Sequence, residues 1–415
     1  MNDVDVAIIG GGIGGAALGG YLARAGLRVL ILERETTFAD RVRGEWMAPW
    51  GVVELRRLGL YERFMAAGGH HLARHIGYDE LVPVEVASTR PLPISELLPG
   101  VPGPLCLEHV VMQNAALAQA SASGALVRRG VSDVQIDAGP RPSVKFVDGG
   151  VATRVAARLV VGADGRTSTV RRQLGLVLEE APIDHLIAGL LIEGAGGWPE
   201  DLQAGGKVGD LHYLVFPQGG GQVRLYVDFT ADDRGRFTGS GGAERLLAAF
   251  AEMPCVPHSD AIAAARPIGP CRSYPSQDAW LDEPCVEGAI LIGDAAGYND
   301  PIIGQGLSIT LRDARIVGEI LTGSDDWSVA AFAPYAAERR ERLRRLRASA
   351  EFATSLNARF APEDLERRAR ATQRMAGDAS LAMPIVAVFV GPEAVDASYF
   401  TREFHEQVFG PGDAA

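Results

Sequence analysis

The first chemically suggestive residues of the chain are three glycines, Gly10, Gly12 and Gly15, followed by an acidic residue at Glu33. Gly10 permits a tight turn, Gly12 lets a phosphate approach the backbone, and Gly15 lets a helix pack closely on a strand. A helix beginning at Ile13 would present free N–H groups to that phosphate, and Glu33 could accept hydrogen bonds from ribose hydroxyls. The pattern therefore predicts a site for a dinucleotide with free ribose hydroxyls, FAD or NAD rather than NADP.

Two further motifs lie at the ends of expected strands. The first, after an apolar run at 158–162, has the form DGxxSxxR and begins at Asp164. The second follows an apolar run at 289–292, begins with Gly293-Asp294, and continues through Pro301 to the Gly304-Gln305-Gly306-Leu307 stretch that opens a helix. An acidic side chain at a strand end can hold a sugar hydroxyl, and a glycine-rich helix N-terminus can stabilise negative charge on a cofactor.

These motifs need a parallel sheet with helices between its strands. The continuous apolar runs at 4–9 and 28–32 predict its first buried strands, joined by a helix over 13–25. Residues 181–270 alternate in polarity as a second sheet would, with strands expected at 186–192, 211–216 and 223–229, and residues 331–375 predict arginine-rich helices. Within those helices, the charged run from Glu338 to Arg347 is interpreted as a solvated face with Glu–Arg pairs.

Composition excludes several classes of function. The 415 residues carry a net charge of −12, which argues against a nucleic-acid partner. The four cysteines form no CxxC pair, and His70, His71 and His75 are interpreted as part of a solvated loop, so no metal site is expected. The N-terminus lacks the features of a signal peptide, and the apolar stretch at 381–390 is too short to span a bilayer. A cytoplasmic location without a membrane span is expected.

The three motifs together resemble those of flavoprotein monooxygenases of the para-hydroxybenzoate hydroxylase family. That family carries GxGxxG, DGxxSxxR and a GD-x(6)-P-x-x-GxG segment in this order, and here they span residues 4–321. The chain departs from the family pattern at Gly297, where His is common, and at Leu307-Ser308, where Leu-Asn is common. The resemblance implies an α/β fold with a discontinuous Rossmann-like FAD-binding domain, an inserted β-sheet substrate domain and C-terminal helices.

The resemblance also implies a division of the chain and a cofactor. The FAD-binding domain would comprise residues 1–75, 100–180 and 271–330, the substrate domain 76–99 and 181–270, and the C-terminal helical segment 331–415. FAD would be bound non-covalently. Because the chain holds no second GxGxxG, NAD(P)H would act as a transient reductant, or a separate flavin reductase would supply the electrons.

Individual FAD contacts follow from the same resemblance. Glu33 would hold the adenosine ribose, Asp294 the ribitol, and Arg43 the phosphates. A polar residue near the start of the helix before the middle motif would face the flavin, and His109 and Gln113 are the two candidates. The expected FAD contacts are Gly10, Gly12, Ile13, Gly14, Gly15, Glu33, Arg34, Arg43, His109, Asp164, Gly293, Asp294, Pro301, Gly304, Gln305, Gly306 and Leu307.

The implied activity is transfer of one oxygen atom, from O2 by way of a flavin C4a-hydroperoxide, to an aromatic or other electron-rich small molecule in secondary or catabolic metabolism. Arg224 and Tyr226 are expected on one strand face, where a positive charge would favour the reduced flavin or an anionic substrate. Alternatively, Arg224 pairs with Asp228 or Asp210. The expected substrate-facing residues are His212, Tyr213, Arg224, Tyr226 and Pro301.

Two other flavoprotein activities remain as alternatives. The string at 212–217 resembles the YxWxFP string of geranylgeranyl reductases, which reduce prenyl double bonds, although it lacks the tryptophan. A flavin-dependent halogenase is disfavoured, because the chain lacks the WxWxIP string and the lysine that such enzymes carry.

Overall fold

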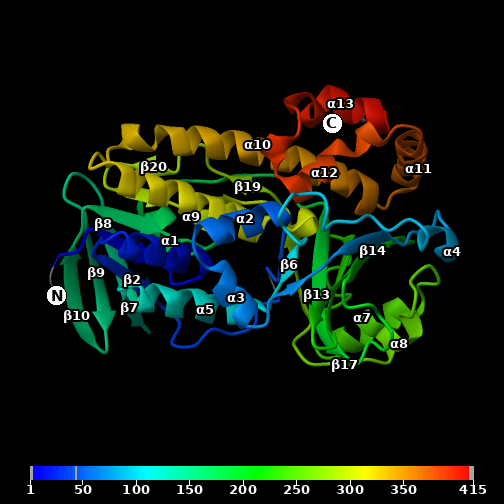
Figure 1. Ribbon diagram of the computed structural model, residues 1–415, viewed down its shortest axis with the longest axis horizontal. Helices are drawn as coiled ribbons and strands as arrows, with labels where there is room; N and C mark the ends of the chain where they lie inside the picture. The colour runs from blue at the N-terminus through cyan, green and yellow to red at the C-terminus, as the bar shows by residue number, and fades with distance from the viewer. Residues whose placement is uncertain (1–2, 43, 411–415) are drawn as a thin grey trace.

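The first glycine turn belongs to a βαβ unit at the centre of a six-stranded sheet. In the computed structural model, which describes residues 3–42 and 44–410, β1 (Val6–Ile9) pairs in parallel with β2 (Val29–Glu33) and β11 (Leu159–Gly162) (Figure 1). Every residue of β1, β2 and β11 is buried, as their continuous apolar runs predict. The sheet order is β20-β21-β11-β1-β2-β7, with β7 at Leu126–Arg129, β20 at Cys285–Val286 and β21 at Ala289–Leu291.

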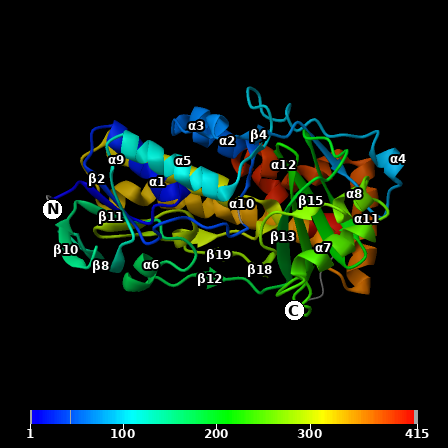
Figure 2. The ribbon, with the colours of Figure 1, turned by 90° about the horizontal axis from the view of Figure 1, so that it is seen from below.

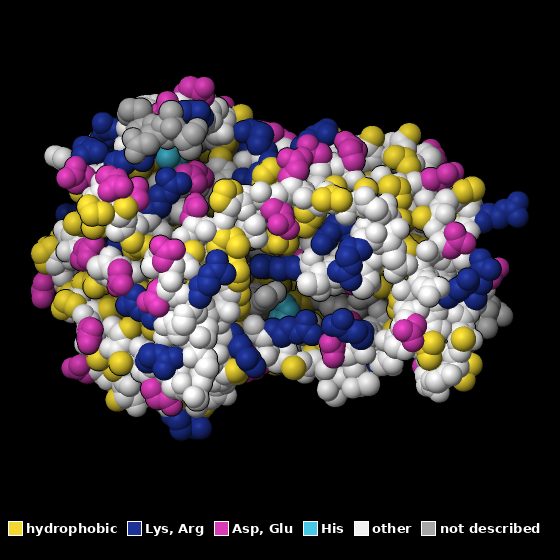
Figure 3. All heavy atoms as spheres, turned by 180° about the vertical axis from the view of Figure 1, so that it is seen from behind, with side chains coloured by type: hydrophobic (Ala, Val, Ile, Leu, Met, Phe, Trp, Pro, Cys, Tyr) yellow, Lys and Arg dark blue, Asp and Glu magenta, His cyan; other side chains and the backbone are white. Residues whose placement is uncertain are grey.

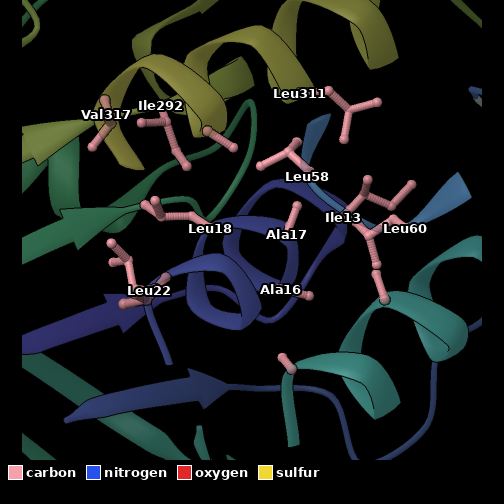
Figure 4. Close-up of a cluster of buried hydrophobic side chains, with 14 of the residues drawn as sticks. Ile13, Ala16, Ala17, Leu18, Leu22, Leu58, Leu60, Ile292, Leu311 and Val317 are labelled. Carbon is pink, nitrogen blue, oxygen red and sulfur yellow. The ribbon is translucent and has the colours of Figure 1, made fainter. Parts of the chain in front are cut away.

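Helices cover one face of this sheet. The crossover helix α1 (Ile13–Arg24) packs between α5 (His109–Ala122) and α9 (Gly306–Gly323), and its buried side chains meet those of Leu311 and Val317 (Figure 4). The glycines of α1 let these helices approach closely, since a Cβ on Gly14 would stand 2.6 Å from Thr310 Cγ2. Two shorter helices, α2 (Pro49–Arg57) and α3 (Tyr61–Ala66), extend this layer.

The opposite face is covered by a small antiparallel sheet of β8 (Ser132–Asp137), β9 (Ser143–Asp148) and β10 (Val151–Ala156). Its apolar side chains join those of β1 and β2 in a second buried cluster. The other short elements in this half are α6 (Thr169–Gln173), β3 (Trp46–Met47), β4 (His70–His71), β6 (Leu105–Cys106), β12 (Glu179–Glu180), β19 (Ala279–Trp280) and β22 (Gly297–Tyr298).

A seven-stranded sheet forms the other half of the molecule (Figure 2). Its three long central strands are those predicted by alternation: β13 (His185–Glu193), β15 (Leu211–Gly219) and β16 (Gln222–Thr230). The remaining strands are β5 (Arg74–Gly77), β14 (Leu202–Val208), β17 (Arg266–Pro267) and β18 (Arg272–Ser276), and α4 (Val84–Ala87), α7 (Gly242–Ala251) and α8 (Ser259–Ala263) accompany them. Strands β5 and β18 lie at the expected domain borders, and both pair within this sheet.

The C-terminal quarter is helical, as predicted. The 25-residue helix α10 (Ala333–Asn357) runs along the long side of the molecule from the six-stranded sheet toward α12 (Met383–Val390) (Figure 1). Helices α11 (Pro362–Gly377) and α13 (Arg402–Phe409) complete this layer, and short 3-10 turns link it: η3 (Val329–Phe332), η4 (Ala379–Ala382), η5 (Pro392–Ala394) and η6 (Ala397–Phe400). Within the described residues, none of the helices combines the length and apolarity needed to cross a bilayer.

Candidate cofactor and substrate site

A continuous cavity of about 1330 Å³ joins the two halves of the molecule. It begins at the carboxyl ends of β1 and β2, passes the segment 293–307, and ends against the seven-stranded sheet. On the rear face the molecule is hollowed between the halves, with a histidine at the floor and Lys or Arg side chains around the rim (Figure 3). The cavity exceeds the size usual for a single small ligand, so it has room for a dinucleotide and a second molecule.

Most of the residues predicted from the sequence line this cavity. Among them are Gly10, Gly12, Ile13, Gly14, Glu33, Arg34, His109, Asp164, His212, Tyr226, Gly293, Asp294, Pro301, Gly304, Gln305, Gly306 and Leu307. Gly15, Tyr213 and Arg224 are not among the lining residues, and Arg43 lies outside the residues that the structure describes. Gln113, the other candidate beside His109, lines the cavity as well.

The glycine turn has the geometry that a diphosphate requires. Gly10 has φ +105°, and a Cβ there would stand 2.4 Å from the carbonyl oxygen of Ala163. A Cβ on Gly15 would stand 2.0 Å from the carbonyl oxygen of Gly10, which explains why Gly15 packs behind the turn rather than facing the cavity. Gly12 is open toward the cavity, and in the described part of the chain no side chain caps the N-terminus of α1. Its free N–H groups can therefore bind phosphate oxygens.

Glu33 ends β2 with its carboxylate held in place. Oε2 accepts a hydrogen bond from Gly11 N at 2.7 Å, and Oε1 accepts one from Glu35 N at 2.8 Å. Each oxygen retains a second acceptor site for a ribose hydroxyl, because an ionised carboxylate can accept about four hydrogen bonds. The side chain thus both braces the glycine turn and fits an adenosine ribose.

We expect the Glu33→Ala substitution to weaken FAD binding by roughly 10- to 150-fold, because loss of a charged hydrogen-bond acceptor costs about 1.5–3 kcal/mol. The measurement is titration of the apoprotein with FAD, followed by flavin fluorescence. Glu252→Ala is the matched control, since Glu252 is exposed at the C-terminus of α7 and does not line the cavity. Equal FAD affinities of wild type and Glu33→Ala would contradict the ribose role.

Asp294 lies in the turn η1 (Gly293–Ala296), which a buried ion-pair cluster holds from behind. Asp313 of α9 accepts hydrogen bonds from Gly293 N at 2.8 Å, from Arg339 Nε at 3.0 Å and from Arg342 Nη2 at 2.7 Å. Burial would raise the pKa of Asp313, but the two guanidinium groups outweigh it and hold that pKa below its usual value. The turn is therefore fixed by α9 and α10 together.

This cluster corrects the interpretation of the charged run in α10 as a solvated face. Arg339 and Arg342 are only 1% and 3% exposed, and Arg339 also donates to the carbonyl oxygens of Ala296 and Gly297 at 2.9 and 3.0 Å. The predicted helix pair of Glu338 and Arg342 does form, at 3.0 Å. Spacing within one helix cannot reveal a partner such as Asp313 on another helix.

Gly297, the departure from the family pattern, has a structural cause. Its φ is +116°, and a Cβ there would stand 2.6 Å from the carbonyl oxygen of Ala279. Nearby, Arg166 donates to Asp294 at 3.3 Å and stacks over the ring of Tyr298 at 4.5 Å. Only glycine fits the backbone here, and the polar side chains at the cavity come from its neighbours.

The segment before α9 is also shaped for an anionic group. Pro301 opens the 3-10 turn η2 (Pro301–Ile303), which ends at Gly304 with φ +64°. Gln305 accepts a hydrogen bond from Trp50 Nε1 at 2.8 Å and donates to Ile303 O, so its side chain fixes the turn. Among residues 3–42 and 44–410, no atom lies within 4 Å of a Cβ placed on Gly306, and no side chain caps α9. The helix N-terminus therefore faces open space and favours negative charge.

Asp164 and His109 line the cavity, and both also form hydrogen bonds with backbone groups. Asp164 accepts hydrogen bonds from Ser168 Oγ at 2.5 Å and from Thr169 N at 2.6 Å, at the start of α6. His109 begins α5, and its Nδ1 donates to Gly44 O at 3.1 Å; burial lowers the pKa of His109. Both side chains fix loops beside the glycine turn.

Arg224 lies beneath the cavity wall rather than in it. It is fully buried and forms an ion pair with Glu45, and Asp40 lies 3.6 Å from its Nη2. The expectation that Arg224 faces the substrate is therefore wrong, and so is the alternative pairing with Asp228 or Asp210, because Asp228 contacts His212 and Asp210 contacts Arg236. Tyr226, two residues along the strand, does line the cavity.

The expectation that both His212 and Tyr213 face the substrate is wrong for Tyr213. Side chains alternate along β15, so His212, Leu214 and Phe216 face the cavity. Tyr213 points to the other face, where its hydroxyl donates to Tyr78 O at 2.5 Å and its ring meets Phe250.

His75 corrects the interpretation of the histidine-rich segment as a solvated loop. Its ring lines the cavity beside Gln203, although His70 and His71 bind backbone carbonyls elsewhere. Among the described residues there is no group of His, Cys, Asp or Glu that could hold a metal ion.

Several cavity residues carried no signal in the sequence. The ring of Trp46 stacks on that of Phe216 and meets the ring of Phe389 edge-on, with 6.0 Å between the ring centroids in each pair. Phe389 belongs to α12, and Ala353 and Asn357 of α10 also line this end. These helices follow the three motifs in sequence, and nothing in their amphipathic pattern marks them as part of the cavity.

Two known protein families are similar to overlapping parts of this chain. The family described as "FAD binding domain" matches residues 3–196, and the family described as "Squalene epoxidase" matches residues 156–332. Squalene monooxygenase of Mus musculus is 25% identical over 79% of this chain and 56% of its own length. Rifampicin monooxygenase of Streptomyces venezuelae is 27% identical over 78% of this chain and 65% of its own length.

Among solved structures, p-nitrophenol 4-monooxygenase PnpA of Pseudomonas putida superimposes with a TM-score of 0.77. It is 19% identical and covers 94% of this chain and 98% of its own, so it shows that the fold is shared. The chain spans 56–60% of the length of the squalene epoxidases it matches first.

Proposed function

We propose that this chain is an FAD-dependent monooxygenase of the para-hydroxybenzoate hydroxylase type, and that it inserts one oxygen atom of O2 into an electron-rich, aromatic small molecule. The observation that carries the proposal is the continuous cavity, which joins the dinucleotide cradle to a wall of aromatic and polar side chains on the seven-stranded sheet. A redox cofactor and an organic substrate can therefore meet without leaving the protein.

The residues present fit FAD. Gly10 and Gly12 with the N-terminus of α1 would hold the diphosphate, Glu33 the adenosine ribose, and Asp294 the ribitol. The uncapped N-terminus of α9 would stabilise negative charge on the reduced ring. When bound, FAD supplies the electron transfer and oxygen activation that amino-acid side chains cannot, and the protein supplies binding, orientation and electrostatics.

The six-stranded half would thus bind the cofactor and the seven-stranded sheet the substrate. Trp46, Phe216, Tyr226 and Phe389 give the substrate end the apolar, aromatic surface that suits an aromatic ring. NAD(P)H, or a separate flavin reductase, would deliver the electrons. All four cysteines, Cys106, Cys255, Cys271 and Cys285, are free, which supports a reducing, cytoplasmic location.

Labelled oxygen tests the proposal. The holoenzyme is incubated with 18O2 and a panel of phenols and hydroxyquinones, with NADH, NADPH or chemically reduced flavin as the electron source. We expect at least one product whose mass increases by one 18O atom, detected by mass spectrometry. Boiled enzyme and catalase-containing reactions control for free hydrogen peroxide. Reduction of a substrate double bond without oxygen incorporation would replace the proposal with a reductase activity.

A further inference from the structure

A buried chain of titratable side chains ends at the substrate end of the cavity. His212 on β15 and Asp228 on β16 are direct cross-strand neighbours, and Nδ1 of His212 lies 2.7 Å from Asp228 Oδ2. Asp228 is fully buried, and its other oxygen lies 3.7 Å from Nε2 of the buried His185. Nothing in the family motifs accounts for this His–Asp pair.

Asp228 fixes which nitrogen of His212 carries the proton. An ionised carboxylate only accepts hydrogen bonds, so Nδ1 of His212 donates, and Nε2 of the neutral ring is left as an acceptor. Among the described residues, the hydrogen bonds of this ring run only through Nδ1. Nε2 lies 4.0 Å from the position of a Cβ on Gly205, which also lines the cavity. The glycine leaves that nitrogen accessible.

A second chain of hydrogen bonds fixes the opposite tautomer on His75. Trp46 Nε1 can only donate, and it binds Gln203 Oε1 at 2.8 Å. The amide nitrogen of Gln203 therefore donates to Nδ1 of His75, at 3.2 Å. This leaves the ring proton of His75 on Nε2, on the side of the ring away from Gln203. Burial and the neighbouring His212 lower the pKa of His75 to about 4, so the ring is neutral at pH 7.

From these two fixed tautomers we propose that the substrate carries an acidic hydroxyl, which binds His212 Nε2, and a separate carbonyl oxygen, which accepts from His75 Nε2–H. The inference rests on the proposed function, and it adds the identity of the two oxygen groups that the site recognises. A plain hydrocarbon would leave both nitrogens without partners, whereas a hydroxyaryl or enolic ketone would satisfy both.

His212 would also take the hydroxyl proton. The substrate O–H bond breaks, a bond forms between that proton and Nε2, and Nδ1–H stays hydrogen-bonded to Asp228, whose negative charge stabilises the imidazolium. No electron is transferred in this step. The resulting oxyanion makes the aromatic or enolic carbon more electron-rich, which oxygen insertion requires.

Two further titratable groups, Lys207 and His185, lie near the His212–Asp228 pair. Lys207 on β14 is the neighbour of His212 across the strands, but the ammonium group donates to Gly209 O and lies 4.6 Å over the ring of Phe360. His185 lies behind Asp228, and its Nε2 is also 3.6 Å from Asp300 Oδ1. Among the described residues, Asp228, Lys207 and His75 flank His212, His185 lies behind Asp228, and Asp79 after β5 also lines the cavity.

The test measures binding to the oxidised holoenzyme without any reductant, so it does not depend on turnover. The probes are 4-hydroxyacetophenone and 2-hydroxyanthraquinone, their methyl ethers, and 4-ethylphenol, which lacks the carbonyl. We expect wild type to bind each hydroxy ketone at least tenfold more tightly than its ether. Absorbance of the bound hydroxy ketone should also show ionisation at a pH at least one unit lower than in free solution.

Three variants separate the two histidines. His212→Gln should abolish the ionisation shift and reduce the preference for hydroxyl over ether to less than threefold, and Asp228→Asn should weaken both effects. His75→Leu should instead remove the preference for 4-hydroxyacetophenone over 4-ethylphenol and keep the ionisation shift. The matched control is His258→Asn, because His258 is exposed with φ +58°, a conformation that Asn accommodates.

Flavin content and circular dichroism identify any variant that fails to fold. In that case the affinities of the wild-type protein for each hydroxy ketone and its methyl ether decide whether the proposal holds. If neither hydroxy ketone binds wild type better than its ether, the proposal is overturned even when oxygen insertion is observed. If the preferences appear but no labelled oxygen enters any product, the recognition of two oxygens stands and the monooxygenase proposal fails.

Discussion

Replacement of Asp313 by alanine is expected to lower the free energy of unfolding by about 3–5 kcal/mol, because it leaves two buried guanidinium groups without their carboxylate. Asp313 is fully buried between Arg339 and Arg342 and also accepts from Gly293 N. The same change releases the turn that carries Asp294, so FAD should be lost at lower denaturant concentrations than in wild type. Denaturant unfolding followed by tryptophan and flavin fluorescence measures both effects.

The pH dependence of this effect has a definite sign. The folded pKa of Asp313 lies below its unfolded value, so its stabilising contribution is complete above about pH 5 and is lost as the pH falls through the folded pKa. The difference between wild type and Asp313→Ala should therefore be constant from about pH 5 to 8 and shrink below about pH 4. Asp326→Ala, at an exposed turn, is the control. Unfolding midpoints of Asp313→Ala equal to those of wild type would refute the bracing role.

Replacement of Arg224 by methionine should also cost about 3–5 kcal/mol of unfolding free energy, since it strands the carboxylate of Glu45 in the interior. Glu45 is 3% exposed, and burial already raises its pKa while Arg224 is present. Without Arg224, the pKa of that carboxyl should rise further, because only the effect of burial remains. The variant should therefore be more stable at pH 5.5 than at pH 8, and this trend should be steeper than in wild type, where Arg224 opposes the effect of burial on Glu45.

A double substitution separates structure from catalysis at this pair. Glu45→Leu with Arg224→Met replaces both charges by apolar groups, and such replacements of buried pairs are often neutral or stabilising. We expect the double variant to recover most of the stability lost in Arg224→Met, as measured by a double-mutant cycle. If it is stable and yet reduces its flavin slowly in rapid-reaction experiments, the Glu45–Arg224 pair acts on the cofactor, since Glu45 itself lines the cavity.

The local motifs could be predicted because each depends on residues close together in the sequence. The strand at 6–9, the turn at Gly10 and the helix from Ile13 follow from an apolar run, a glycine that needs positive φ, and an uncapped helix start. Long-range partners could not be predicted in this way. Glu45 and Arg224 are 179 residues apart, and Asp313 and Arg339 are 26 apart on different helices. Charge alone does not indicate which of many arginines each carboxylate meets.

In the seven-stranded sheet, too, the sequence predicts the strands but not which of their faces lines the cavity. Alternation correctly located β13, β15 and β16, but it does not say which face of β15 meets the cofactor side. Because adjacent residues point to opposite faces, His212 and Tyr213 could not both line the cavity, and only the packing of α7 against the other face decides between them.

Helix α10 fixes the distance between the two ends of the cavity, because it is continuous from one end to the other. Arg339 donates a hydrogen bond to the turn that contains Asp294. Asn357 follows 18 residues later in the same helix and lines the far end of the cavity, about 27 Å away. One inserted residue between them would turn the far end by about 100° and shift it by about 1.5 Å. The far wall of the cavity would rotate away while the turn beside Asp294 stayed in place, so length variation in this helix is tolerable only outside 339–357.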